Sequence, residues 1–362
     1  MASTGSTGYD SQTATLSASV DDFTFAIDIA NLSSDAKSAL AAHGSTDGIR
    51  VFSSDGSTEY ARDIIDGSHS AGTGLIRFQI PGASGTSVGV RVYVDADGSY
   101  AASDTYGSDN AYNSGWEAYW PEGGGSDRTS NSNDLTAFGS PTVGGVAGQV
   151  GSGTDYSDAQ SSYIESAVVS GPACTFMAWF KPANDTHNGT MVSVSDFSTT
   201  ARYLGLFNRG GEAGDYLQAV SRNTNFAGPT TTSGFTASAW NHGACTFDTG
   251  TDATVYLDAA NTASSSGLET VVGIDNTEIG GLGRGNTHNQ IDSFVGVLNE
   301  VQIHSAARSA DWIATEYDQT NDNATFWGSF TWTSLSEAAS SFTGIAFGIA
   351  PIATGIRMGR GL

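Results

Sequence analysis

Short runs of alternating apolar and polar residues, separated by tight-turn dipeptides, constrain the fold of this chain more than any other feature. The runs lie at residues 23–29, 49–52, 75–80 and 88–94. A period of two places the apolar side chains on one face of an extended strand, which is typical of half-buried antiparallel sheets. Asp55-Gly56 and Asp97-Gly98 lie between runs and favour hairpin turns. The pattern predicts an all-β protein, with one short helix expected at residues 33–42.

The length of the chain predicts more than one domain. A single hydrophobic core stops growing at roughly 250–300 residues, and this chain has 362. Residues 103–114 lose all periodicity and indicate a boundary loop. We therefore expect two antiparallel β-sandwich (jelly-roll) domains in tandem, at residues 1–108 and 109–320, followed by a C-terminal extension at residues 321–362.

The charge of the chain bears on its partners. Lys and Arg number 14 against 38 Asp and Glu, a formal net charge of −24 at pH 7. This excess repels nucleic-acid phosphates and anionic membrane surfaces. The most apolar stretch, residues 342–356, is interrupted by Gly and Pro and is shorter than the ~20 residues of a membrane helix. We expect no nucleic-acid partner and no membrane insertion.

The first residues, Met1-Ala2-Ser3-Thr4-Gly5, lack the basic and apolar regions of a signal peptide. Synthesis in a cytoplasm without signal-directed export is the expectation from this end of the chain. Cys174 and Cys245 each precede a Thr-Phe pair in a strand-like run, and buried thiols are favoured over a disulfide.

A succession of segments in the second region carries a family resemblance. These segments are residues 116–120, 175–182, 240–248, 254–258 and 294–304, followed by a helical pattern at 309–317. Their order resembles a laminin-G-like, or concanavalin A-like, lectin-fold module over residues 116–317. The family usually has Gly after the Asp at position 258, where this chain has Ala259. The resemblance implies a lectin-like sandwich.

The first region resembles the small β-domain of unknown function that precedes such modules in bacterial and phage surface proteins. The matching segments are residues 28–32, 47–59 and 76–93. This arrangement implies a bacteriophage virion surface protein, either a capsid decoration or head fibre or a tail fibre, that presents its lectin-like domain to host-surface glycans. A secreted bacterial adhesin or carbohydrate-binding module is the first alternative, and a glycan-processing enzyme is the second.

The residues argue against catalysis. Glycoside hydrolases of this fold need two carboxylates that flank the scissile bond, but Glu278 and Glu300 each stand alone on their strand-like segments. Glu300 is expected to make a structural hydrogen bond to a turn. The six histidines show no metal-ligand spacing. We expect no enzymatic activity.

Carbohydrate recognition uses aromatic rings beside polar side chains. Tyr203, Phe207, Asn208 and Arg209 form the predicted glycan-binding patch, and residues 223–226 form a second candidate. Packing of these side chains within the core or a loop is the alternative.

The resemblance also implies a calcium ion at the rim of the sandwich, held by carboxylate and carbonyl oxygens. Asp155, Asp158 and Asp292 are the candidate ligands, chosen by their positions in loops. No other cofactor is expected.

The C-terminal extension belongs to neither resemblance. Its aromatic residues and terminal arginines suggest an assembly arm that docks on another virion protein or on a second copy, through Trp327, Trp332, Arg357 and Arg360. A strand that completes one of the two sandwiches is the alternative.

Overall fold

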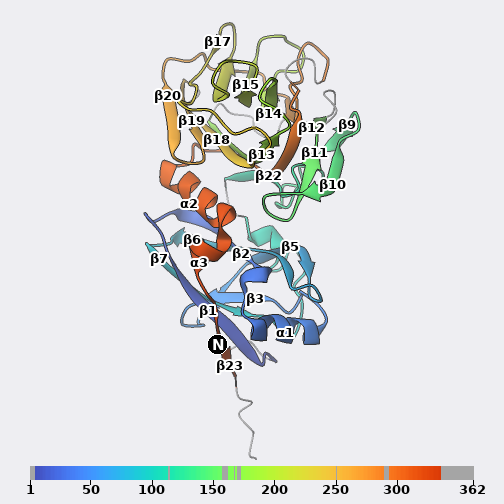
Figure 1. The fold of residues 1–362 in the computed structure, drawn as a ribbon, viewed down its shortest axis with the longest axis vertical. Helices are drawn as coiled ribbons and strands as arrows, with labels where there is room; N and C mark the ends of the chain where they lie inside the picture. The colour runs from blue at the N-terminus through green and yellow to red at the C-terminus, as the bar shows by residue number, and fades with distance from the viewer. Residues whose placement is uncertain are drawn as a thin grey trace, which may run out of the picture.

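The computed structural model of the chain describes residues 5–112, 115–156, 168, 173–249, 251–288 and 293–335, together with the backbone of residues 162–166. The described residues form four antiparallel sheets, which make two sandwiches placed one above the other along the long axis (Figure 1). The predicted fold class, an all-β protein with two sandwich domains in tandem, is confirmed.

The first domain packs a five-stranded sheet against a three-stranded one. The first sheet has the order β23-β1-β7-β3-β4, with β1 at Gly8–Thr15, β3 at Arg50–Ser53, β4 at Glu59–Tyr60, β7 at Ser87–Tyr93 and β23 at Thr331–Ser334. The second has the order β2-β6-β5, with β2 at Asp21–Asp28, β5 at Arg62–Ser68 and β6 at Thr73–Ala83. Phe23, Phe25 and Ile27 alternate along β2 and are fully buried, as their period of two predicts.

Helix α1 (Ser34–His43) confirms the helix expected at residues 33–42. It begins after Ser33, whose hydroxyl accepts a hydrogen bond from the backbone N–H of Ala36 at 3.1 Å. It ends at Gly44, whose φ of 81° is left-handed. Glycine adopts this conformation without the steric penalty of a Cβ atom.

The second domain is a larger sandwich. One sheet has the order β10-β11-β22-β13-β18-β19-β20, with β8 also paired to β22; the bounds are β8 Trp116–Trp120, β10 Thr142–Ala147, β11 Ser152–Asp155, β13 Cys174–Pro182, β18 Asn241–Asp248, β19 Asp252–Leu257, β20 Asn261–Ser265 and β22 Gly296–His304. The other has the order β17-β16-β15-β14-β21-β12-β9, with β9 at Thr136–Phe138, β12 at Ser162–Ser166, β14 at Asn188–Ser195, β15 at Tyr203–Arg209, β16 at Tyr216–Arg222, β17 at Phe226–Ala227 and β21 at Asn276–Ile279.

The two sheets of the second domain enclose one apolar core. Phe176 and Phe180 of β13 meet Leu204 and Leu206 of β15 across it, and all four are fully buried. Cys174 and Cys245 are free thiols buried in this core, so the expectation of buried thiols is confirmed. Burial raises the pKa of both thiols.

A buried ionic cluster joins the two domains. The guanidinium of Arg77 on β6 pairs with the carboxylates of Glu300 on β22 and Glu316 on helix α2 (Ala310–Asn321), the latter at 3.0 Å. Arg77 also lies 5.2 Å from the ring centroid of Tyr119. Because all these side chains are buried, the cluster holds the two sandwiches in one arrangement. The side chain of Glu300 thus bonds to Arg77 and Tyr119, and only its backbone N–H reaches the turn, at Pro121 O.

The described part of the C-terminal extension returns to the first domain. Helix α3 (Asn323–Trp327) places Trp327, 2% exposed, against Phe25 and Phe78, and the indole N–H of Trp327 donates to Ala26 O at 2.6 Å. Strand β23 then pairs with β1, with Trp332 opposite Asp10. Residues 331–334 are therefore a strand that completes a sandwich, which was the alternative to an assembly arm. None of the helices among the described residues has the length and apolarity to cross a membrane.

Candidate functional site

The outward side of the seven-stranded sheet carries the candidate site. Strand alternation sends Leu204 and Leu206 of β15 into the core and leaves Tyr203, Phe207 and Arg209 on the other side. We call this side the distal face, because Figure 1 shows β14, β15 and β17 at the end of the molecule farthest from the first domain. The distal face is defined by Tyr203, Phe207, Arg209, Val220, Arg222, Phe226, Leu282 and Arg284.

The pairing of β15 with β16 brings two distant segments of sequence together on this face. Tyr203 lies directly opposite Arg222, and Phe207 lies opposite Gln218. The guanidinium carbon of Arg222 is 5.8 Å from the ring centroid of Tyr203, and Arg222 Nη1 donates to the Tyr203 hydroxyl at 3.4 Å.

The loop after β21 covers the middle of the distal face. Ser193 donates to Gly281 O at 2.8 Å and Ser195 donates to Gly283 O at 2.6 Å, which fixes this loop to β14. Leu282 consequently packs with Tyr203, Phe207 and Val220 in a small apolar cluster. Arg284 follows in the same loop, with its guanidinium carbon 5.8 Å from the Tyr203 ring centroid and Nη1 donating to Thr200 O at 3.2 Å.

A second aromatic and cationic group lies beside this cluster. The guanidinium carbon of Arg209 is 5.2 Å from the ring centroid of Phe207 and 4.9 Å from that of Phe226, and Arg209 Nε donates to Gln218 Oε1 at 2.8 Å. The ring of Phe226 is 44% exposed. It therefore offers an accessible flat surface next to a cation.

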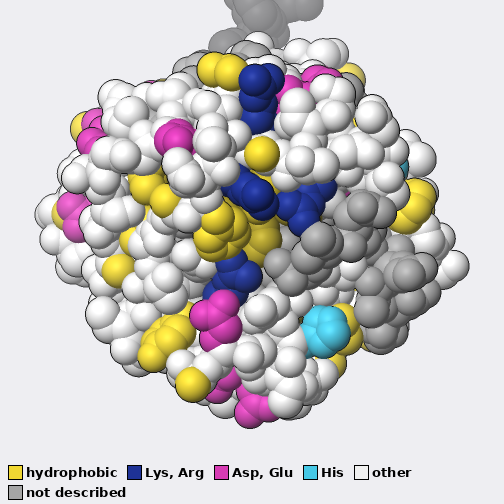
Figure 2. All heavy atoms as spheres, turned by 90° about the horizontal axis from the view of Figure 1, so that it is seen from above, with side chains coloured by type: hydrophobic (Ala, Val, Ile, Leu, Met, Phe, Trp, Pro, Cys, Tyr) yellow, Lys and Arg dark blue, Asp and Glu magenta, His cyan; other side chains and the backbone are white. Residues whose placement is uncertain are grey.

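Positive charge gathers on this face of an otherwise acidic chain. Figure 2 looks down on the same end of the molecule and shows Lys and Arg side chains around an apolar centre. Arg202 pairs with Asp196 at 3.1 Å. Within the described part of the chain, no carboxylate forms an ion pair with Arg222 or Arg284, and Nε of Arg222 is buried without a hydrogen-bond partner.

One buried carboxylate lies at the edge of the face. Glu278 of β21 is fully buried, and its Oε2 lies 3.5 Å from Nδ1 of His288. The His288 ring stacks on Phe197 with centroids 4.4 Å apart. This carboxylate is thus enclosed beneath His288 and the loop after β21, where a Cβ added at Gly283 would lie 2.7 Å from Glu278 Oε2.

The structure brings together only three of the four residues of the predicted glycan-binding patch. Tyr203 and Phe207 do lie on one face with Arg209, but they are 3% and 1% exposed because Leu282 and the arginines cover them. Asn208 points to the other side of β15 and donates to His187 O at 3.1 Å. Glycan binding by these four residues stays a prediction. Of the second candidate, residues 223–226, Phe226 supplies the exposed ring.

The other predicted site residues lie elsewhere. Asp155 ends β11, while Asp158 and Asp292 fall outside the described residues. No group of three His, Cys, Asp or Glu side chains among the residues described is arranged to hold a metal ion, and the calcium site stays a prediction. Trp327 and Trp332 have the intramolecular partners given above, and Arg357 and Arg360 lie outside the described residues.

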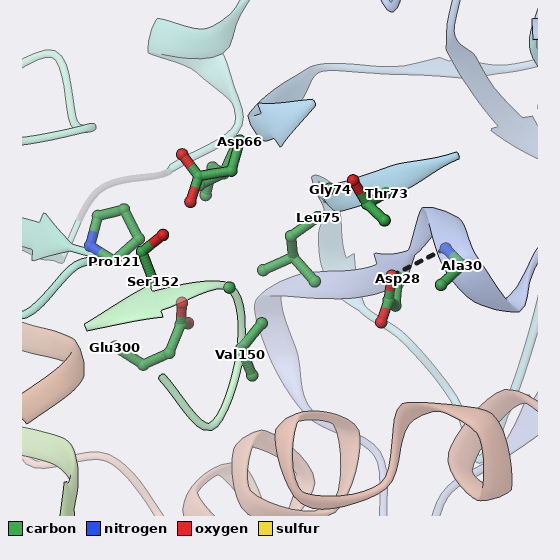
Figure 3. Close-up of a pocket in the computed structure, with 12 residues that line it drawn as sticks. Asp28, Ala30, Asp66, Thr73, Gly74, Leu75, Pro121, Val150, Ser152 and Glu300 are labelled. Carbon is green, nitrogen blue, oxygen red and sulfur yellow. Dashed lines mark hydrogen bonds between the residues drawn. The ribbon is translucent and has the colours of Figure 1, made fainter. Parts of the chain in front are cut away.

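A pocket of about 370 Å³ at the domain junction is the main rival to the distal face (Figure 3). Asp28, Asp66 and Glu300 line it from three different strands or their loops. Two of these carboxylates already have partners: Glu300 accepts from Arg77 and from the Tyr119 hydroxyl, and Asp28 accepts from the Ala30 N–H at 2.8 Å. The junction pocket therefore offers few groups to a ligand, and the distal face offers several.

Comparison with known proteins identifies the fold of the second domain. Residues 152–314 match the family model described as "Concanavalin A-like lectin/glucanases superfamily". The second domain has the concanavalin A-like lectin fold. This agrees with the laminin-G-like resemblance of the sequence, and it places the distal face on a sheet of a lectin-type sandwich. Comparison with curated proteins gives no match.

Several solved structures are similar to part of this chain. Domain 4 of AbnA, a GH43 extracellular arabinanase from Geobacillus stearothermophilus, in complex with arabinotriose, has 17% identity and a TM-score of 0.48, over 55% of this chain and 97% of that one. The Ruminococcus gnavus IT-sialidase CBM40 bound to alpha2,3 sialyllactose has 18% identity and a TM-score of 0.35, over 40% and 82%. The NanB sialidase from Streptococcus pneumoniae has 16% identity and a TM-score of 0.34, over 41% and 24%. At these TM-scores the likeness identifies no shared ligand.

Proposed function

We propose that the lectin-fold domain is a non-catalytic glycan-binding module that uses the distal face, and that the chain displays it on a surface. The observation that carries the proposal is the combination of an exposed ring, Phe226, with arginines that lack carboxylate partners among the described residues. Sugar recognition pairs flat apolar contact with directed polar groups, and the distal face has both.

The placement of the chain ends supports display. Strands β1 and β23, which hold the two ends of the described chain, pair with each other at the end of the molecule opposite the distal face (Figure 1). A support attached near these strands leaves the distal face pointing outward. We propose a bacteriophage virion as the first candidate for that support, with a secreted bacterial adhesin or carbohydrate-binding module as the alternative.

A glycan microarray probed with the full chain tests binding. We expect defined glycans to bind the parent protein and to bind Phe226→Ala at least ~10-fold more weakly, because the variant loses the exposed ring while the core is untouched. Val272→Ala is the matched control, since Val272 is 52% exposed and lies outside the defined distal face. An array without any bound glycan contradicts the proposed function.

A separate experiment tests the place of display. Mass spectrometry of banded virus particles is expected to find the chain if the support is a virion. Recovery of the chain only from bacterial culture medium, free of particles, contradicts the virion and supports the adhesin alternative.

A further inference from the structure

We infer that the distal face selects glycans that carry a carboxylate, and that Arg222 and Arg284 hold this carboxylate above Tyr203. The inference rests on the proposed function and deepens it, because it names the class of sugar. It starts from charge: the chain has 14 Lys and Arg residues for a net charge of −24, and yet Arg209, Arg222 and Arg284 all lie on this face.

Two arginines of the distal face lie near the same aromatic ring. Both guanidinium carbons lie 5.8 Å from the centroid of the same Tyr203 ring, and they reach it from two different segments, β16 and the loop after β21. A planar guanidinium has five N–H donors in a fork that matches a carboxylate. The recorded bonds use Nη1 of Arg222 toward the Tyr203 hydroxyl and Nη1 of Arg284 toward Thr200 O. No other hydrogen bond joins either guanidinium to the described residues.

The unmet hydrogen bonding of Arg222 points to a ligand. Its Nε is buried and has no hydrogen-bond partner among the described atoms, and a buried donor without a partner costs free energy. A carboxylate bound between Arg222 and Arg284 supplies an acceptor and a compensating charge. Arg202, by contrast, already has Asp196 as its partner, and its role is expected to be smaller.

The surroundings make this arrangement preorganised. Ser193 and Ser195 fix the loop that carries Arg284, and Leu282 packs the loop onto Tyr203 and Phe207. Groups that are already held in place lose little conformational freedom when a ligand binds. Phe226, at the guanidinium of Arg209, then offers an apolar surface for the C–H groups of a sugar ring.

The structural alternative is that the arginines only cover Tyr203. A guanidinium near an aromatic ring is attracted to the ring without any ligand. The chain contains a matched example in the first domain, where the guanidinium carbon of Arg91 lies 4.8 Å from the Tyr9 ring centroid. Arg91→Gln therefore removes the same kind of contact away from the distal face.

Isothermal titration of the full chain in 150 mM salt with matched sugar pairs tests the inference. The pairs are 3′-sialyllactose against lactose, and digalacturonic acid against its methyl ester, so each pair differs in the carboxylate and the two acids distinguish a sialic acid from a uronic acid. We expect one acidic member to bind at least ~10-fold more tightly than its neutral partner, and Arg222→Gln and Arg284→Gln each to remove most of that preference. Arg91→Gln is expected to leave it unchanged.

Arg284→Lys keeps the charge and loses the fork, and is expected to recover only part of the preference. Thermal melts of each variant check that folding is retained. Equal binding of the acidic and neutral members, unaffected by the arginine variants, overturns the inference and leaves the proposed function standing. The inference is also overturned if inorganic sulfate binds the site as tightly as the acidic sugar and displaces it, because the site then binds any anion. Failure of every sugar to bind contradicts the proposed function itself.

Discussion

Arg77 shows how a single residue fixes the relation between the two domains. Its guanidinium is fully buried and meets two carboxylates, Glu300 and Glu316, one from a strand of the lectin-fold domain and one from α2. Gln302 and Gln319 donate to Glu316 at 2.7 Å and 2.5 Å. Burial raises the pKa of Glu300 even with Arg77 beside it. We expect the loss of any one member to leave a buried charged or polar group without its partner.

Removal of the Arg77 side chain is therefore expected to lower the free energy of unfolding strongly. Arg77→Ala leaves two carboxylates buried without their cation, and we expect a loss of about 3–5 kcal/mol in the free energy of unfolding. Urea unfolding followed by tryptophan fluorescence measures this loss. Arg91→Ala, at a partly exposed position, is expected to cost about 1 kcal/mol or less. Equal losses for the two variants contradict an essential role for the cluster.

His242 gives the protein a predictable response to acid. It is buried between Trp179 and Tyr317, with ring centroids 5.2 Å and 5.8 Å away, and its Nδ1 lacks a hydrogen-bond partner among the described atoms. Burial lowers the pKa of His242 from 6.5 to about 4. Between these two values the unfolded chain binds a proton at this side chain and the folded chain does not. This residue therefore lowers stability as the pH falls from about 6.5 to about 4.

His242→Phe keeps a ring in the core and removes the titration. We expect the variant to lose about 3 kcal/mol less than the parent between pH 7 and pH 4. Urea unfolding at several pH values measures the free energy of unfolding of variant and parent. The difference between the two proteins separates the titration of His242 from that of the carboxylates, which both proteins share. If the free energy of unfolding changes with pH in the same way for both proteins, the claim that His242 is buried in its neutral form is contradicted.

At the scale of elements, the sequence predicts the strands well and their partners less well. Alternation of apolar and polar residues along β2 and β7 predicted these two strands of the first domain. It also marks Arg222 as an outward residue of β16, since Leu217 and Ala219 alternate with it and are buried. The contact of Arg222 with Tyr203 depends on the register of β15 with β16, which the buried face and the geometry of the connecting turn set together.

The sequence also could not predict that Leu282 and Arg284 cover Tyr203. Leu282 and Arg284 belong to a Gly-rich loop whose composition predicts only a connection between strands. Its position over β14 depends on bonds from Ser193 and Ser195, far away in sequence. The role of Glu300 could not be predicted because it lies in a β-bulge. Between the pairs Trp179–Asn299 and Met177–Gln302, β22 has one more residue than β13. Glu300 lies in this bulge with a φ of 53°.

Helix α3 is an integral part of the first domain. Trp327 fills its core between Phe25, Phe78 and Phe330. Trp327→Ala is expected to lower the free energy of unfolding of the first domain by about 3–5 kcal/mol, because it creates a large cavity and removes the bond to Ala26 O. Trp332→Ala, on the edge strand β23, is expected to cost about 1 kcal/mol. Urea unfolding of both variants measures the contrast, and a stable Trp327→Ala protein contradicts this role.

At the scale of the whole molecule, the two ends have different structures and different proposed roles. One end brings β1 and β23 together, and the other end presents the distal face (Figure 1). The buried cluster around Arg77 connects the two domains. Under the proposed function, this connection keeps the distal face at a constant distance from the support.

Hydrogen–deuterium exchange of the full chain, with and without the strongest-binding glycan from the microarray, tests the central claim most directly. The account predicts slower amide exchange in residues 203–209, 216–222 and 280–285, which form the distal face. Protection instead at residues 73–75 and 150–152, which line the junction pocket, would place the glycan between the domains and contradict the account.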